Sequence, residues 1–441
     1  MGKSVLSCID SFFGISNRGS NIKTEIIAGI TTFLSMCYII IINPTIMMAA
    51  GIPFGDAVWA TVITICVCTM LMGFYTNRPY VVAPLVSQNT LVIYVLCGLL
   101  HYPWRSVLGA SFLAGVLFTL FFLSGIWEIV IQSIPDTITR SCTRSIGFFI
   151  AFLGTSNSGI VILGGMTIAT PFLRDIQPYN LLALLIGITI IGVLMIRGTP
   201  GALMGGILTS ALFAYILGIE TLPPSICTLP PGFPGFIFHP DIGSVVSPVM
   251  LPVIALFFLL TFFDSIATIF GLSMLTQKEG EQTNNENNRR SFLATGYSMM
   301  IGSSLGCTPS SIYIESVAGV REGGRTGLVS VVVVVFTICS QFFLPLIESF
   351  PDVATAAALL VIGLLMLAQF RLQSLSSREE LLTAFVLMVT MTITQNIGLG
   401  LSMGIITYPI FMFAAEKHRD IPRVFWSLVL CAAIFLIFFP Y

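Results

Sequence analysis

Charged residues are scarce in this sequence. Only 9% of its 441 residues are Asp, Glu, Lys or Arg and 56% are hydrophobic, whereas a soluble globular domain carries about 25% charged residues. A chain of this composition cannot hide its apolar surface inside a soluble fold. The net charge of −1 leaves no basic patch for nucleic acid. The composition therefore predicts a protein embedded in a lipid bilayer, with no nucleic-acid partner.

Residues that build catalytic and metal sites are also few. The three histidines lie in segments that we expect to be loops, and the ten cysteines are scattered. Only Cys66 and Cys68 are close, and C-x-C inside an apolar run is not a metal-ligand spacing. There is no credible Ser/His/Asp set and no phosphate-binding G-x-x-x-x-G-K-[ST] motif. The sequence argues against an enzyme and predicts neither a metal nor a cofactor.

Long apolar runs recur along almost the whole chain. Most are about 20 residues long, enough to cross a hydrocarbon layer of roughly 30 Å as a helix. We predict fourteen membrane spans, at 25–49, 57–75, 80–100, 106–132, 145–165, 179–196, 201–218, 248–275, 292–306, 308–320, 326–347, 353–369, 380–396 and 399–415. The apolar stretch 424–440 is either a fifteenth span or a segment that lies against the membrane surface.

Lys and Arg set the orientation of these spans, because both residues favour the cytoplasmic side. With the N-terminus inside and the spans alternating, only Arg105 and Arg174 fall outside. The loop 219–247 has no Lys or Arg and should be outside, and the polar loop 276–291 should be cytoplasmic. The first 24 residues lack the apolar core of a signal peptide. We expect a multi-pass protein of the cell (inner or plasma) membrane with a cytoplasmic N-terminus.

The two halves of the chain resemble each other. Three pairs of segments match in the same order: 42–52 with 263–273, 83–91 with 308–316, and 201–213 with 400–412. These matches support a repeat of seven plus seven spans, and because seven is odd the second copy must be inverted. Inverted repeats are typical of transporters, whose sites lie near the midplane where discontinuous helices meet.

The segment 307-CTPSSIYIESVAGVREGGRTG-327 interrupts the apolar pattern. Thr308-Pro309 should break span 10, because the residue before proline disfavours the helix and proline has no N–H. Pro84 occupies the corresponding place in span 3. Polar side chains follow each break and could satisfy freed backbone groups or a ligand: Ser310 and Ser311 in span 10, and Ser87, Gln88 and Asn89 in span 3.

Two carboxylates lie inside predicted spans. An ionisable residue at mid-span costs at least about 2.5 kcal/mol on insertion scales, so each is a candidate functional residue. Asp264 lies in the apolar run 256–272, and Thr268 follows it on the same helical face. Glu315 lies in the broken span 10.

Structural interpretations of these residues remain open. Asp264 could be a carboxylic acid bonded to a neighbouring helix end. Glu315 could form an ion pair with Arg321 or Arg325, and Asn89 could join helices without touching a ligand.

Four segments follow a family pattern: 24-TEIIAGITTFLSMCYIIIINPTIMMAAGI-52, 145-SIGFFIAFLGTSNSGIVI-162, 261-TFFDSIAT-268 and 313-YIESVAGVREGGRTGL-328. Through them the chain resembles the AzgA-like purine permeases, within the nucleobase–cation symporter group that shares the uracil-permease fold. The last segment is the most specific match. The resemblance spans about residues 10–415.

The resemblance implies an all-α polytopic membrane protein of fourteen spans, in which a core domain carries substrate past a gate domain. The expected divisions are the cytoplasmic segment 1–24, the core at 25–132 and 248–347, the gate at 145–218 and 353–415, the extracellular loop 219–247, and the C-terminal apolar segment 416–441. Spans 3 and 10 are expected to be broken by short extended segments.

Members of this family are typically proton-coupled importers of adenine, guanine or hypoxanthine. The resemblance therefore implies a nucleobase substrate and a coupling proton as partners. Its purine-contacting positions fall on Asn89, Asp264 and Glu315, and the two carboxylates are the candidates for proton coupling. A homodimer is an open alternative to a monomer.

The chain departs from the family pattern at some positions. Span 3 reads A-P-L-V-S-Q-N where the family usually has A-P-G-M-G-x-N, and Ala267 replaces a glycine in span 8. Lost glycines limit close approach of the backbone to a flat ring. A carrier of another small metabolite on the same fold is therefore an alternative, as is a channel.

Overall fold

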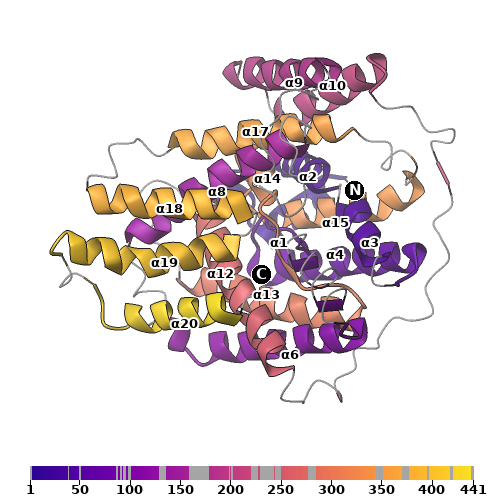
Figure 1. The fold of residues 1–441 in the computed structure, drawn as a ribbon. Coiled ribbons are helices and arrows are strands. Elements are labelled where there is room, and N and C mark those ends of the chain that lie inside the picture. The colour runs from indigo at the N-terminus through magenta and orange to yellow at the C-terminus, as the bar shows by residue number, and fades with distance from the viewer. Residues whose placement is uncertain are drawn as a thin grey trace.

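The computed structural model of the chain is mostly helical (Figure 1). It describes residues 2–37, 39–48, 51–85, 88–89, 92, 96–97, 101–128, 136–157, 178–197, 199, 202–219, 227–228, 243, 250–276, 285–343, 345, 351–369, 377–394, 397–417 and 421–438.

The helices of the first half are α1 (Gly2–Phe13), the 3-10 helix η1 (Ser16–Arg18), α2 (Ile22–Met36), α3 (Ile39–Met48), α4 (Phe54–Thr76), α6 (Trp104–Leu123), α8 (Asp136–Asn157), α9 (Pro178–Ile196) and α10 (Ala202–Ile216). Those of the second half are α12 (Leu251–Thr276), α13 (Asn285–Ser304), α14 (Ser316–Arg321), α15 (Leu328–Ser340), the 3-10 helix η4 (Gln341–Phe343), α17 (Asp352–Gln369), α18 (Arg378–Thr394), α19 (Ile397–Ala414) and α20 (Phe425–Phe438). Two short strands, β1 (Val82–Pro84) and β2 (Ser310–Ile312), pair antiparallel.

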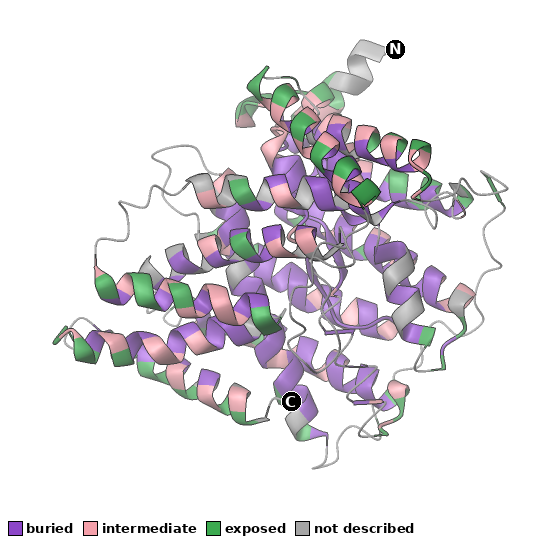
Figure 2. Cartoon of the chain, turned by 45° about the horizontal axis from the view of Figure 1, so that its top comes forward, coloured by how far each residue is buried: buried purple, intermediate pink, exposed green. Residues whose placement is uncertain are grey.

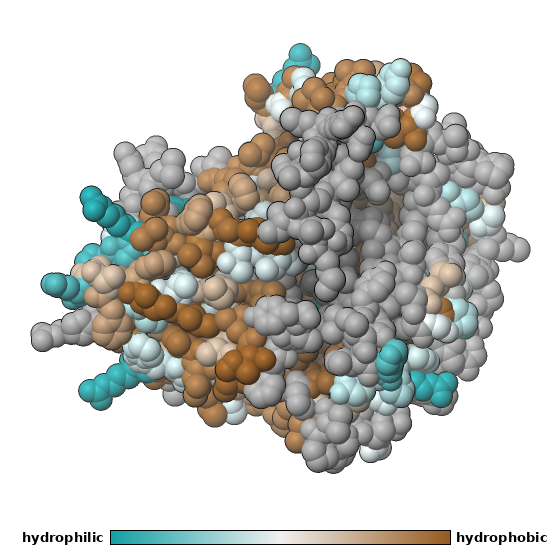
Figure 3. Space-filling view, in the orientation of Figure 1, coloured by the Kyte–Doolittle hydropathy of each residue, from teal (hydrophilic) through white to brown (hydrophobic). Residues whose placement is uncertain are grey.

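Several helices have the length and composition of membrane spans. Within the described residues, four helices qualify: Gly55–Thr76, Trp104–Leu123, Pro178–Ile196 and Val253–Ser273. Large apolar side chains point outward, as at Leu185, Leu212 and Phe385, which are more than half exposed. Figure 3 shows apolar residues over the visible face of the helices and hydrophilic ones gathered at their ends on the left. This surface suits lipid rather than water, as expected for a multi-pass membrane protein.

The helices pack in two groups. In one, α13 packs on α4 and α6, and α15 packs on α2 and α4. In the other, α17 packs on α8, α9 and α10, and α18 packs on α8 and α19. The long helix α12 contacts both groups, because it packs on α6 and α13 on one side and on α8 and α19 on the other. Figure 2 shows buried residues concentrated in the interior of the helical assembly and exposed ones towards its periphery.

Glycine permits close contact between two helices of the second group. A Cβ at Gly154 of α8 would lie 2.8 Å from Leu360 N of α17, and a Cβ at Gly363 of α17 would lie 2.4 Å from Ala151 N of α8. The contact is reciprocal, with each helix offering glycine to the other. The expected repeat would make these helices equivalent, as spans 5 and 12.

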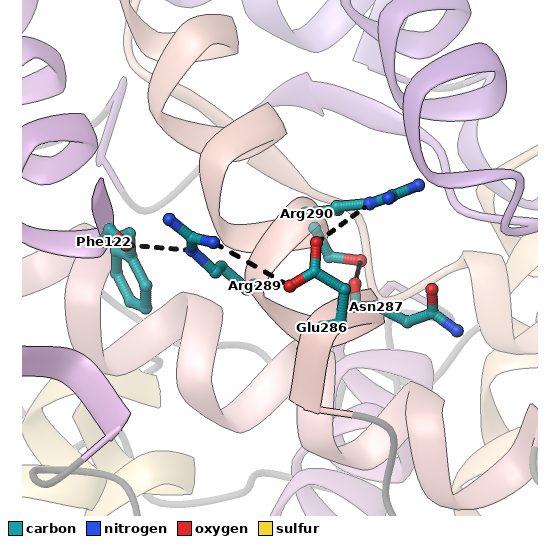
Figure 4. Close-up of polar contacts among 6 residues, drawn as sticks. Phe122, Glu286, Asn287, Arg289 and Arg290 are labelled. Atoms are coloured by element: carbon teal, nitrogen blue, oxygen red, sulfur yellow. Dashed lines mark hydrogen bonds and ion pairs between the residues drawn. The ribbon is translucent and has the colours of Figure 1, made fainter. Parts of the chain in front are cut away.

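Helix α13 begins at Asn285, whereas the apolar run predicts a span from 292. Its first turns are polar and contain two ion pairs made by Glu286. Glu286 Oε2 lies 3.8 Å from Arg289 Nη1, and Glu286 Oε1 lies 3.3 Å from Arg290 Nε (Figure 4). Arg289 Nε also donates to the carbonyl of Phe122 on α6 at 3.4 Å (Figure 4). Hydropathy reports where a helix meets lipid, so it cannot detect polar turns that extend the helix beyond the apolar run.

Replacing Gly319 by alanine should destabilise the protein. An added Cβ would lie 2.1 Å from Thr32 Oγ1 and 2.6 Å from Ala28 O, and the backbone carbonyl cannot turn away. Overpacking of this kind costs roughly 1–3 kcal/mol. We expect Gly319→Ala to lower the unfolding temperature in detergent, whereas Gly192→Ala, which meets nothing within 4 Å, should not lower it. Equal unfolding temperatures for the two variants would contradict this packing.

Candidate substrate-binding site

The paired strands bring together Pro84 and Pro309, where the sequence predicts the two proline breaks. Ala83 lies opposite Ser311, and Pro84 lies opposite Ser310. The pairing continues past the strands, because Leu85 N donates to Pro309 O at 3.2 Å. Both strands are buried. The polar residues that follow the two breaks in the sequence therefore meet at one place inside the protein.

Helix α12 passes beside both breaks and is bonded to each. Gln88 Nε2 donates to Thr261 Oγ1 at 3.3 Å, and the hydroxyls of Ser265 and Ser311 lie 3.3 Å apart. Thr261, Asp264 and Ser265 are three and four residues apart, so they share one face of the helix. Asp264 is thereby placed between the contact to the first break and the contact to the second.

The two predicted carboxylates are both buried, Asp264 at 8% exposure and Glu315 at 5%. Glu315 is the residue that immediately precedes α14, and its own backbone is already helical. The elements that carry the two carboxylates pack together, because α12 contacts α14. One comes from an unbroken helix and the other from the start of a half-helix.

Other predicted residues line the same region with different partners. Thr268 is buried one turn beyond Asp264 on α12. Ser310 is buried and donates to Thr308 O at 3.3 Å. Ser87 lies outside the described residues.

Asn43 also belongs to this polar region, although it was not among the site residues predicted from the sequence. Asn43 lies in α3, is fully buried, and accepts a hydrogen bond from Asn89 Nδ2. Its Nδ2 donates to Thr61 Oγ1 of α4 at 2.7 Å. The signal was present in the sequence, because Asn43 is the polar residue at the end of the first apolar run, in the segment that matches 263–273.

Several acceptor oxygens of the region lack a donor. Gln88 Oε1, Asn89 Oδ1 and Asp264 Oδ2 are buried, and none has a hydrogen-bond partner within the described part of the chain. A buried polar group without a partner costs about 1–3 kcal/mol. These oxygens are available to a ligand that brings N–H or O–H donors.

Basic residues are missing from the segments that form the region. Residues 80–100, 248–275 and 308–320 contain no Lys or Arg. Among the described residues there is also no group of three His, Cys, Asp or Glu side chains that could hold a metal ion. The region therefore offers acceptors and carboxyl groups, which suit a neutral ligand with N–H donors better than an anion.

A carboxylate from α2 fixes the turn that follows the half-helix. The Glu25 carboxylate is fully buried and accepts from Arg325 N at 2.9 Å, from Thr326 N at 3.2 Å and from Thr326 Oγ1 at 2.8 Å. Arg325 in turn donates to Val320 O and Gly324 O, at 2.8 and 2.9 Å. These bonds hold both the last turn of α14 and the start of α15, and so help to place Glu315 at the other end of α14.

Comparisons with known proteins place the chain among transporters. Residues 23–399 match the model of the family described as the Permease family. The guanine/hypoxanthine permease PbuO of Bacillus subtilis is 32% identical over 93% of this chain and 96% of its own length. The adenine permease AdeQ of Escherichia coli is 30% identical over 97% of this chain and 95% of its own length.

A solved structure shares the fold. The transmembrane domain of a cyanobacterial bicarbonate transporter, BicA, matches 86% of this chain and 97% of its own length with a TM-score of 0.57, at 14% identity. Identity this low supports the fold of a membrane transporter and leaves the substrate undecided.

Proposed function

The chain belongs to the Permease family, and from this premise we propose that it is a secondary active transporter that imports a purine nucleobase by proton symport and alternating access. The relatives PbuO and AdeQ are permeases for guanine, hypoxanthine or adenine. The observation that carries the proposal is the meeting of both proline breaks with α12, where Gln88, Asn89, Asp264 and Glu315 gather.

A purine base complements the hydrogen bonds that this region leaves unused. Guanine, hypoxanthine and adenine each carry N–H donors on a flat, uncharged ring. The unpaired oxygens of Gln88, Asn89 and Asp264 are acceptors. Binding such a ring would supply donors to groups that are costly to leave unpaired.

The two carboxylates suit different roles in this proposal. Glu315 begins the half-helix beside the ligand, where an ionised carboxylate can accept two ring N–H bonds at roughly 1.5–3 kcal/mol each. Asp264 lies in the uninterrupted apolar helix α12, where a charge is costly, so proton exchange there can be linked to movement across the membrane. We assign substrate binding mainly to Glu315 and proton coupling mainly to Asp264.

The finer architecture belongs to the same proposal. It has fourteen spans in two inverted repeats, a core domain (25–132 and 248–347) and a gate domain (145–218 and 353–415), with spans 3 and 10 broken. The grouping of α2, α4, α6, α13 and α15 apart from α8, α9, α10, α17, α18 and α19 supports this division. The N-terminus is cytoplasmic in the cell membrane, and a homodimer is compatible with the fold.

Transport of another small metabolite is the alternative, since the solved relative BicA is a bicarbonate transporter. An anion favours a positive residue at its site. Because the segments around Asn89, Asp264 and Glu315 contain no Lys or Arg, the site favours a neutral base.

Uptake of labelled bases by cells that lack their own purine permeases tests the proposed function. We expect accumulation of at least one of guanine, hypoxanthine and adenine, and its loss when a protonophore removes the proton gradient. Bicarbonate should neither compete nor accumulate. Accumulation that persists with the protonophore but needs sodium would refute proton symport while preserving the purine substrate.

Two carboxylate variants test the division of roles. Glu315→Gln keeps the shape but replaces an acceptor oxygen by a donor, so we expect the affinity for the base to fall about tenfold to a hundredfold. Asp264→Asn should still bind and exchange the base but fail to accumulate it against a gradient. Equilibrium binding in detergent and proton-driven uptake in vesicles are measured for both. The opposite pattern would reverse the roles, and normal behaviour of both variants would place the site elsewhere.

Thiol labelling tests the fourteen-span topology. Single cysteines are introduced into a cysteine-free background at 219–247 and at 276–291, and intact cells are treated with an impermeant thiol reagent. We expect labelling only at 219–247, because this loop has no Lys or Arg and the other has several. Labelling of intact cells at 276–291 would refute the proposed orientation.

A further inference from the structure

A series of buried hydrogen bonds connects α4 to the candidate site. The Thr61 hydroxyl donates to Ala57 O at 2.7 Å, and Asn43 Nδ2 donates to Thr61 Oγ1 at 2.7 Å. Asn43 Oδ1 then accepts from Asn89 Nδ2, and also from Thr308 Oγ1 at 3.3 Å. The four side chains in this series of hydrogen bonds are all buried, at 1% exposure or less.

The direction of every hydrogen bond in this series follows from the first one, between Thr61 and Ala57. A backbone carbonyl can only accept, so the single proton of the Thr61 hydroxyl points to Ala57 O. Thr61 Oγ1 must then accept from its other neighbour. An amide donates through nitrogen and accepts through oxygen, so Asn43 turns its Nδ2 to Thr61 and its Oδ1 to Asn89.

Asn89 is left with one available orientation. If its amide turned over, its oxygen would face the oxygen of Asn43 with no hydrogen between them, and Asn43 Oδ1 would keep only the 3.3 Å bond from Thr308 Oγ1. Asn89 therefore gives its Nδ2 to Asn43 and keeps its Oδ1 for the site, where that oxygen is buried and meets no donor from any described residue. An asparagine can in general donate or accept, but at this position the carbonyl oxygen is the atom left for a ligand.

We propose that Asn43 and Thr61 are positioning residues for substrate selectivity: by fixing the Asn89 amide, they make the site prefer a base that presents an N–H at that point. This rests on the proposed function, because Asn89 must face the purine. Neither Asn43 nor Thr61 needs to touch the base. A ligand with an acceptor at the same point would place its oxygen or ring nitrogen against Asn89 Oδ1, with no hydrogen between the two acceptors.

Hypoxanthine and adenine are the probes that test this selectivity. Hypoxanthine has an N–H at position 1 and a carbonyl at position 6, whereas adenine has a bare nitrogen and an amino group there. A fixed acceptor should separate the inhibition constants of the two bases by about tenfold or more, whichever base is preferred. The measurement is competition by each unlabelled base against uptake of the labelled base that the wild type transports.

Thr61→Val removes the hydroxyl and keeps the side-chain shape. Asn43 Nδ2 then keeps only two sulfur acceptors, Met47 Sδ at 3.3 Å and Cys307 Sγ at 3.4 Å. Sulfur is a weak acceptor, so the paired amides of Asn43 and Asn89 can turn over together. We expect the ratio of the two inhibition constants to move about tenfold towards one. Thr61→Ser keeps the hydroxyl and is the matched control, so its ratio should stay within about twofold of the wild type.

Asn43→Ala and Asn43→Asp provide a second pair, should Thr61→Val fail to fold. Alanine frees Asn89 and should reduce the ratio, whereas aspartate keeps an acceptor oxygen towards Asn89 and should preserve it. Purified variants are compared only where they elute as the wild type does in size-exclusion chromatography. A purely structural role for Asn43 would lower the amount of folded transporter and leave the ratio unchanged.

The outcomes separate this inference from the proposed function. A wild type that binds none of guanine, hypoxanthine and adenine overturns the proposed function and the inference with it. A wild type that binds hypoxanthine and adenine equally overturns the inference alone. So does a ratio that Thr61→Val and Asn43→Ala leave unchanged in folded, active protein.

Discussion

The need to pair backbone groups inside a membrane is the constraint on which the site depends. Pro84 ends β1 and Pro309 immediately precedes β2, and hydrocarbon offers no water to the N–H and C=O groups of such extended segments. The segments around the two prolines satisfy these groups by pairing with each other. β1 and β2 form an antiparallel pair, Leu85 N donates to Pro309 O, and Val81 N donates to the Ser316 hydroxyl. The pairing that satisfies the backbone also brings polar side chains from both halves of the chain together.

A half-helix as short as α14 needs support from the rest of the protein, because so few residues cannot hold a helix by themselves. Gly319 lets α2 approach α14 closely, and Glu25 of the same α2 fixes the turn after it. Gly319 and Arg325 thus serve the placement of Glu315. This explains why the most specific family-like segment continues well past the carboxylate that it positions.

The sequence was sufficient for the membrane class, the family and most helices, because hydropathy and helix-breaking prolines are local signals. The run 179–196 corresponds closely to α9, for example. The register of β1 against β2 could not be predicted from the sequence, since it depends on contacts between residues far apart in the chain. Asn43 was not predicted for a related reason. Its importance depends on its hydrogen bond with Asn89, and a single sequence does not show which residues are neighbours in space. The predicted roles of Asn89, Asp264 and Glu315 remain predictions.

The position of Leu85 bears on whether the departures from the family pattern close the site. The resemblance places glycine where this chain has leucine, which by itself suggests a narrower site. Side chains alternate along a strand, so Leu85 shares a face with Val81 and Ala83. It packs with them against the cluster formed by α2, α3 and α4, whereas Val82 belongs to the cluster that includes α12. The leucine is therefore accommodated among apolar side chains of α2, α3 and α4, in a cluster that contains no described residue of α12.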